Sequence, residues 1–250
     1  MIGIVGGVGP YAGIDLLKKI YDNTVANSDQ EHLDTVLLSM SSSINDRTEY
    51  LEGIINQNPA DAITKVILKM ESIGVTIAGI PCNTAHSDGI FDIVLEQLQT
   101  AKSSVKLLNM IEESIAFIKN KYPEIKNIGV LSTTGTYKSG VYSKLLKAKG
   151  YNVIVPTMEI QEKYIHSSIY NSEYGIKAKS NPVHERAIKN LFEGIAYLKK
   201  EGTEAVILGC TEIPLAISQK KIEGLITVDP TNVLARALIN NYKPQKLKHN

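Results

Sequence analysis

The chain has 250 residues and two cysteines, whose surroundings are alike. Cys82 follows the apolar run 75–80, and Cys210 follows the apolar run 205–208. Each cysteine therefore comes where an expected strand ends and its loop begins, and in an open α/β sheet that edge presents groups to ligands. Neighbours can bring the pKa of a thiol near neutrality, so this pair predicts acid–base chemistry.

Strands and helices alternate along the chain, which predicts parallel βαβ units and the α/β fold class. In the first half, strands are expected over 2–5, 35–40, 75–80 and 105–108, and helices over 11–24, 60–73, 89–99 and 111–121. In the second half, strands are expected over 127–131, 151–155, 205–208 and 224–228, and helices over 138–149, 160–170, 182–200 and 232–241.

The two halves of the chain repeat one pattern. Ile2 precedes Cys82 by 80 positions, and Ile128 precedes Cys210 by 82 positions. This spacing indicates an internal duplication that leaves one cysteine at the equivalent place in each copy.

The duplication predicts two pseudo-symmetric lobes, each a four-stranded parallel sheet flanked by helices, with the active site in the cleft between them. Residues 1–112 are expected to form the first lobe and residues 113–230 the second. The C-terminal helix, within 231–250, is expected to pack back on the first lobe.

Two thiols in such an arrangement would reach a bound carbon from opposite sides. One sulfur would remove a proton, and the other would return a proton to the opposite face, which inverts a stereocentre. Backbone N–H groups at the strand-to-helix junctions would hold a carboxylate and favour the thiolate form. A single buried cysteine after a strand is more often a small apolar side chain, but duplication of the position disfavours that interpretation.

Four motifs carry a resemblance to a known family. They are Pro-Cys-Asn-Thr-Ala-His at 81–86, Leu-Gly-Cys-Thr-Glu at 208–212, Gly-Gly-Val-Gly-Pro at 6–10 and Asp-Arg-Thr at 46–48. Together they resemble the aspartate/glutamate racemase family, closest to its aspartate racemase branch. The resemblance implies a pyridoxal-independent, cofactor-free racemase of L- and D-aspartate, and also of glutamate, with Cys82 and Cys210 as the catalytic pair. It also implies a homodimer.

The resemblance implies roles for further residues. Arg47 would bind the distal carboxylate of a dicarboxylic amino acid in a bidentate fork, and Lys177 would add a second positive contact. Asn83, Thr84 and Thr211 would hold the α-carboxylate and the amino group, and Thr133, Thr134 and Val8 would line the pocket. Glu212 and His86, from their positions in the sequence beside the cysteines, are expected to support them. Val8 departs from the family, which often has methionine there.

Each of these residues also has a purely structural interpretation. Arg47 could form a surface ion pair with Asp46, Lys177 could belong to a solvated face, His86 could cap or pack, and Glu212 could start a helix.

Composition excludes several classes of protein. The apolar content of 43% and charged content of 21% are typical of a soluble globular protein. The net charge of +1 argues against a nucleic-acid binder, and no apolar run approaches the roughly 18 residues of a membrane span. The N-terminus has no basic region of a signal peptide, so the cytoplasm is expected, where a structural disulfide is improbable. Only His86 has ligand spacing to a cysteine, so no metal is expected.

Three other functions were compatible with parts of the sequence. The turn at 7–12 fits a dinucleotide fingerprint, but the second strand ends in Ser-Met-Ser at 39–41 instead of an acidic residue. A dicarboxylate isomerase or decarboxylase of the same superfamily is also compatible. The decarboxylases typically keep only one of the two cysteines, and the isomerases use one as a nucleophile. A two-lobed small-molecule-binding protein without catalysis would have no reason to place one sulfur in each lobe.

Overall fold

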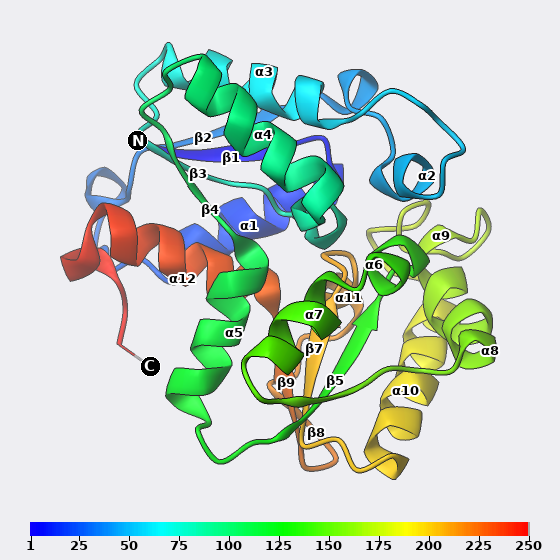
Figure 1. Ribbon diagram of the computed structural model, residues 1–250. Coiled ribbons are helices and arrows are strands. Elements are labelled where there is room, and N and C mark those ends of the chain that lie inside the picture. The colour runs from blue at the N-terminus through cyan, green and yellow to red at the C-terminus, as the bar shows by residue number, and fades with distance from the viewer. Residues whose placement is uncertain (250) are drawn as a thin grey trace. The chain divides into compact units, whose positions relative to one another are not determined.

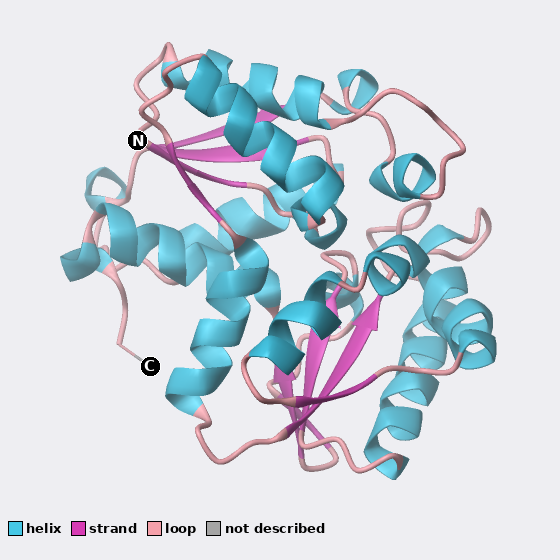
Figure 2. Ribbon diagram, in the orientation of Figure 1, coloured by secondary structure: helices cyan, strands magenta, loops and turns pink. Residues whose placement is uncertain are grey.

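Two mostly parallel β-sheets organise the chain, one in each of two units of the computed structural model, which describes residues 1–249. Unit 1 comprises Met1–Glu113 together with the described C-terminal residues 231–249, and unit 2 comprises Ser114–Pro230. The strands and helices of both units are drawn in Figure 1 and Figure 2.

The sheet of unit 1 has four parallel strands in the spatial order β2-β1-β3-β4. The strands are β1 (Ile2–Gly6), β2 (Thr35–Ser39), β3 (Ile77–Gly79) and β4 (Lys106–Leu108). Every residue of β1 and β3 is buried, as expected for central strands that helices cover on both faces.

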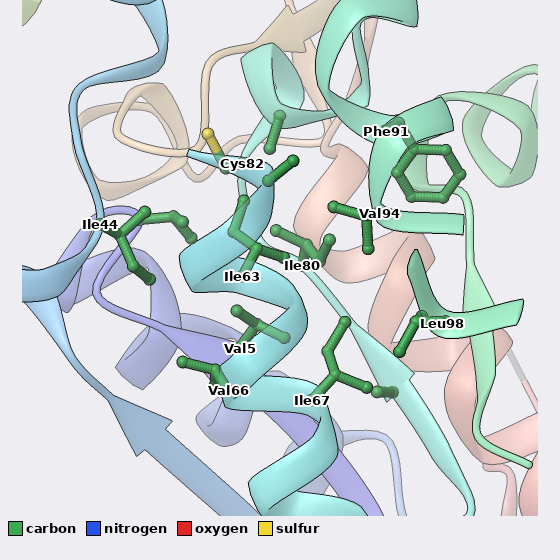
Figure 3. Packing of buried hydrophobic residues seen from close by; sticks show 14 of the residues in the cluster. Val5, Ile44, Ile63, Val66, Ile67, Ile80, Cys82, Phe91, Val94 and Leu98 are labelled. Atoms are coloured by element: carbon green, nitrogen blue, oxygen red, sulfur yellow. The ribbon is translucent and has the colours of Figure 1, made fainter. Parts of the chain in front are cut away.

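Helices cover both faces of this sheet (Figure 1). Helices α3 (Ala60–Glu71) and α4 (Asp88–Thr100) cover one face and bury the cluster that Figure 3 shows from close by. Helices α1 (Pro10–Asp22) and α12 (Pro230–Tyr242) pack on the other face. Helix α1 buries Ala12, Leu16 and Ile20, whose spacing of four residues forms one apolar stripe.

The sheet of unit 2 has the order β6-β5-β7-β9-β8. The strands are β5 (Asn127–Ser132), β6 (Asn152–Ile154), β7 (Ala205–Gly209), β8 (Lys221–Ile222) and β9 (Leu225–Val228). Strands β6, β5, β7 and β9 are parallel to one another. They correspond in spatial order to β2, β1, β3 and β4 of unit 1. The prediction of an α/β fold with a parallel sheet in each lobe is therefore confirmed.

The fifth strand, β8, is an addition to the four that were predicted for unit 2. It pairs antiparallel with β9 through a two-residue turn, Glu223-Gly224, in which both residues have positive φ, 47° and 92°. Such a turn matches the twist of a hairpin. A strand of only two residues gives no alternating pattern in the sequence, so it was missed.

Helices also lie on both faces of the second sheet. Helix α10 (Glu185–Lys200) buries its apolar side against one face, with Leu131 and Leu208 in the same cluster. Helix α7 (Val141–Ala148) lies on the opposite face, where the Tyr142 ring approaches Gly209. Helix α5 (Met110–Lys121) leads into this unit.

Two predicted helices of unit 2 are divided in the structure. The helix expected over 138–149 is α6 (Thr134–Ser139) followed by α7, because Gly140 between them has a φ of 66°. The segment expected over 160–170 is α8 (Met158–Ile160), a π-helical turn η4 (Gln161–His166) and α9 (Ser167–Tyr170).

The remaining elements are short. They are η1 (Asp29–Glu31), η2 (Ser41–Ser43), α2 (Arg47–Leu51), η3 (Asn83–His86), α11 (Ile213–Ala216) and η5 (Pro244–Lys246). Among residues 1–249, no helix has both the length and the apolar character needed to cross a membrane.

Gly7 fixes the loop between β1 and α1. Its φ is 85°, and a Cβ atom there would lie 2.6 Å from the backbone nitrogen of Ser41. We expect Gly7→Ala to lower the free energy of unfolding by about 1–3 kcal/mol, because a strained φ is combined with a backbone clash. Gly53→Ala is the matched control, since Gly53 has a φ of 73° with nothing within 4 Å of an added Cβ.

Urea unfolding followed by circular dichroism compares the two variants. If Gly7→Ala lowers the free energy of unfolding no more than Gly53→Ala does, the loop can move away from Ser41 without loss of stability.

Candidate functional site

Cys82 lies just beyond the end of β3, at the start of the tight turn η3. Its carbonyl oxygen accepts hydrogen bonds from Ala85 N over 3.2 Å and from His86 Nδ1 over 2.9 Å. These two bonds fix the backbone of the turn that carries the thiol. In Figure 3 the sulfur of Cys82 points away from the apolar side chains of Ile63 and Ile80. The thiol is thus held on a rigid turn at the carboxyl edge of the sheet.

His86 is a buried, neutral histidine. Burial lowers its pKa to about 4, although the backbone carbonyls of Cys82 and Leu108 oppose the shift. Its ring stacks on Phe91 with the centroids 4.7 Å apart. A carbonyl oxygen can only accept, so Nδ1 carries the proton that is donated to Cys82. His86 therefore supports the turn and is not an acid at neutral pH.

The buried His86 predicts a pH dependence of the stability of unit 1. A histidine pKa near 4 in the folded state lies below the unfolded value near 6.5, so the unfolded state binds the proton first as the pH falls. The stabilisation is present above pH 6.5 and is lost as the pH falls from 6.5 toward 4, by about 3 kcal/mol in total.

Urea unfolding at pH 7 and pH 4.5 measures this loss. The His86→Gln variant, which has no titrating ring, should lose less stability between the two pH values than the unchanged protein. Equal losses would contradict a buried neutral imidazole as the cause.

Arg47 is placed beside the Cys82 turn by α2, which packs against η3. The Asp46 carboxylate caps α2 by accepting from the backbone N–H groups of Thr48 and Glu49. The Arg47 side chain is only 6% exposed, and Nη1 and Nη2 donate to the carbonyls of Asn45 and Val8 over 2.9 and 2.8 Å. Arg47 is therefore a buried residue and not an exposed surface side chain.

The other predicted residues of unit 1 are buried as well. Asn83 and Thr84 belong to η3, directly after the cysteine. The Val8 side chain is part of the apolar cluster under α3 and α4, and its carbonyl holds Arg47. Unit 1 thus gathers Cys82, Arg47 and the loop of Val8 at the carboxyl ends of neighbouring strands.

Cys210 directly follows β7 in unit 2, and its thiol is bound to a carboxylate. Sγ donates to Glu212 Oε2 over 2.9 Å, and Thr211 Oγ1 lies 3.4 Å from the same oxygen. Burial first, and then the negative charge and hydrogen bond of Glu212, raise the pKa of Cys210 well above its usual value. Cys210 is therefore a thiol in the resting protein, with a proton acceptor already in contact.

Lys177 acts on Cys210 from the segment after α9. Its positive charge lowers the pKa of Cys210, against the larger effects of burial and Glu212. Its Nζ donates to the Tyr170 hydroxyl over 3.2 Å and lies 4.3 Å from the Tyr170 ring centroid. The Lys177 side chain is exposed, but Tyr170 holds its ammonium group, whose charge acts on the Cys210 thiol.

Thr133 and Thr134 follow β5, the strand next to β7. Thr133 Oγ1 caps α6 by accepting from Thr136 N over 3.2 Å. Thr134 Oγ1 donates to Glu162 Oε1 over 2.8 Å and lies 3.0 Å from His166 Nδ1. Both threonines therefore fix the loop at the carboxyl edge of unit 2.

Four further residues near this loop were not predicted from the sequence. Glu162 and His166 contact Thr134, Tyr170 stacks on His166, and Gln161 binds the end of β5. Gln161 Nε2 donates to the Ser132 carbonyl over 2.8 Å. The only signal in the sequence was that these polar residues follow the strand at 152–154, whose carboxyl end meets the same edge. Their contacts with Thr134 and Ser132 join residues about 30 positions apart in the sequence, which residue spacing does not reveal.

Both cysteines are free thiols, Cys82 in unit 1 and Cys210 in unit 2. Across residues 1–249, no three or more His, Cys, Asp or Glu side chains gather in a way that could hold a metal ion.

Known proteins resemble this chain over nearly its full length. A model of the family described as Asp/Glu/Hydantoin racemase matches residues 5–238. The broad specificity amino-acid racemase RacX of Bacillus subtilis is 27% identical over 248 residues, which is 97% of this chain and 98% of RacX.

Solved structures give the same result. An aspartate racemase of Picrophilus torridus superimposes with a TM-score of 0.79 at 30% identity, covering 96% of this chain and 93% of that chain. A glutamate racemase of Francisella tularensis, solved in complex with D-glutamate, shares the fold with a TM-score of 0.64 at 18% identity, over 100% of this chain and 83% of its own. This chain therefore belongs to the Asp/Glu/hydantoin racemase family, whose named racemases are isomerases.

Proposed function

We propose that this protein is a pyridoxal-independent racemase that interconverts L- and D-aspartate, and also the glutamate enantiomers, by proton transfer between the α-carbon and two cysteines. The observation that carries the proposal is topological. Cys82 follows β3 and Cys210 follows β7, and each of these strands is the third in its sheet. One thiol in each of two units with the same strand order is what a two-base inversion needs.

In the proposed reaction the substrate has one sulfur on each face of its α-carbon. The thiolate of one cysteine takes the α-proton and becomes a thiol, while the C–H electron pair stays on the substrate as a carbanion. The thiol of the other cysteine gives its proton to the opposite face and becomes a thiolate. The proton count of the two sulfurs is unchanged after one turnover, but their roles are exchanged.

Cys210 begins the cycle as the proton donor in this scheme, because its thiol is protonated and bound to Glu212. When the reaction starts in the reverse direction, Cys210 must be a thiolate and Cys82 a thiol. Glu212 Oε2 then takes the Cys210 proton along the hydrogen bond that already joins the two groups, and Cys82 takes a proton from solvent. Glu212 would thus be the group that lets Cys210 act in both directions.

The proposed substrate is a dicarboxylic amino acid because of Arg47. Arg47 is buried at the carboxyl edge of unit 1, and a guanidinium can bind a carboxylate in a bidentate fork. Lys177 would add a second cation for the distal carboxylate. Asn83, Thr84 and Thr211 would hold the α-carboxylate and the amino group, and stabilisation of the carbanion would come from these donors and the substrate's ammonium group.

We further propose that the enzyme works as a homodimer and needs no cofactor. Its mechanism requires both thiols in the reduced form, which fits the cytoplasm.

Chiral chromatography of purified, reduced protein tests the proposed activity. Separate incubations with L-aspartate, D-aspartate and L-glutamate should each proceed toward the racemate, and the relative rates rank the substrates. If no enantiomer is converted while both thiols are intact, the racemase proposal fails. Maleate-type and malonate-type acids would then be the next substrates to examine.

A further inference from the structure

The ammonium group of Lys177 stands at one end of a continuous series of side-chain contacts within unit 2. Its Nζ contacts both the hydroxyl and the ring of Tyr170. The Tyr170 ring stacks on the His166 imidazole, with centroids 4.7 Å apart and planes inclined by 12°. Nearly parallel stacking of this kind restricts the tyrosine ring to one orientation. The lysine therefore rests on a side chain that is itself fixed.

The other end of the series is anchored at the end of β5. His166 Nδ1 lies 3.0 Å from Thr134 Oγ1, and that hydroxyl donates to Glu162 Oε1 over 2.8 Å. A hydroxyl has one proton, so while Thr134 donates to Glu162, the N–H of His166 donates to Thr134. Thr134 is buried, and these contacts hold the imidazole at both its nitrogen edge and its face.

The π-helical turn η4 brings these groups together. Glu162 and His166 are four residues apart in this turn, and both contact one hydroxyl, that of Thr134. Gln161, at its first position, is fully buried and bound to the Ser132 carbonyl, which ties the turn to β5. π-helical turns occur frequently at functional sites.

A lysine needs such support to bind an anion at one place. Its long side chain loses considerable rotamer freedom when it is fixed, and Lys177 is exposed. Here the Lys177 backbone N–H donates to the Ile169 carbonyl over 3.1 Å, and Tyr170 holds the ammonium end. Both ends of the side chain are thus positioned on α9 before any ligand binds.

We propose that Tyr170 and His166 are positioning residues that preorganise Lys177 as the contact for the distal carboxylate, and so set a preference for dicarboxylic over neutral amino acids. The inference rests on the proposed function and adds the source of its selectivity. Tyr170 acts through Lys177, and His166 acts through Tyr170.

Calorimetric titration with succinate tests the inference without requiring turnover. Succinate has both carboxylates of aspartate but no amino group, and butyrate is the matched monocarboxylate. We expect Lys177→Met to weaken succinate binding about tenfold, the effect of losing a charged hydrogen bond. Tyr170→Leu should weaken it about threefold, and Tyr170→Phe less, since that variant keeps the ring. Butyrate binding should be unchanged in all three variants.

The double variant Lys177→Met/Tyr170→Leu isolates the positioning role. If Tyr170 acts only through Lys177, the Tyr170 change adds nothing once the lysine is absent. Tyr164→Leu and Lys179→Met are matched controls from the same segment, and both should bind succinate normally. Tyr164 is matched to Tyr170 because it also has a lysine ammonium group near its ring, with Lys163 Nζ 4.9 Å from the centroid.

Two results would overturn the inference. One is a loss of succinate affinity on Tyr170→Leu that is equal with and without Lys177. The other is a parallel loss of butyrate affinity, which would indicate general damage to the unit. Failure of the proposed function is distinguishable: a protein that racemises no amino acid yet shows the coupled loss of succinate binding keeps the inference and refutes the racemase.

Discussion

Replacement of either Cys82 or Cys210 by serine is expected to abolish racemisation, with a fall in kcat of at least about 10³-fold. A serine hydroxyl is far too weak an acid to form the anion that removes an α-proton, and losing an acid–base group costs about 10²–10⁴-fold. Each variant still has one sulfur on one face of the substrate. It should therefore exchange the α-hydrogen of one enantiomer with solvent, and the two variants should differ in which enantiomer that is.

Loss of the α-hydrogen signal in deuterated water measures this exchange for each enantiomer separately. Far-UV circular dichroism and the urea midpoint serve as controls, because both cysteines are buried and serine is a close isostere. If both variants exchange both enantiomers at equal rates, the cysteines are not separate bases. The proposed division of labour would then be wrong, even if racemisation itself were confirmed.

Glu212→Gln is expected to lower kcat about 10²-fold in the direction that requires the Cys210 thiolate, and less in the other direction. The substitution has two opposing effects. It removes a negative charge that raises the pKa of Cys210, and it removes the base that accepts the thiol proton. Burial, the larger cause of the raised pKa, is unchanged, so the thiol stays protonated near neutral pH and the loss of the base dominates.

The pH dependence of alkylation separates these effects, measured in a Cys82→Ser background so that only Cys210 reacts. Iodoacetamide should modify Cys210 at lower pH in the Glu212→Gln variant, because the repelling charge is gone. Glu223→Gln is the control, since Glu223 is an exposed acid of the same unit, paired with Lys199. If Glu212→Gln changes neither the pH dependence of alkylation nor kcat in either direction, Glu212 has only a packing role.

Periodicity and repetition in the sequence predict most of the fold. The strands that carry the cysteines are continuous apolar runs, so β3 and β7 and their neighbours were found within a few residues. The spacing of Cys82 and Cys210 from the first strand of each half also predicted a duplicated unit, and the parallel strands of the two sheets do share a strand order. Two local features were not predicted. Strand β8 is too short to give a pattern, and Gly140 divides a helix whose apolar periodicity continues across it.

Contacts between residues far apart in sequence could not be predicted in the same way. The motif at 46–48 identified Arg47, but not that it would be buried and held by the Val8 carbonyl. Glu212 was found because it lies two residues from Cys210. The contacts of Lys177 with Tyr170, and of Thr134 with Glu162 and His166, join separate segments of unit 2, and residue spacing does not reveal them.

The early isotope content of both enantiomers in deuterated water tests the central claim most directly. L-aspartate is incubated with reduced, cofactor-free protein, and the two enantiomers are separated at a few per cent conversion. Two bases that exchange their protons with solvent predict D-aspartate with deuterium at the α-carbon, while the remaining L-aspartate keeps its hydrogen. D-aspartate that retains the original hydrogen, or equal deuterium in both enantiomers from the start, would contradict a two-cysteine racemase.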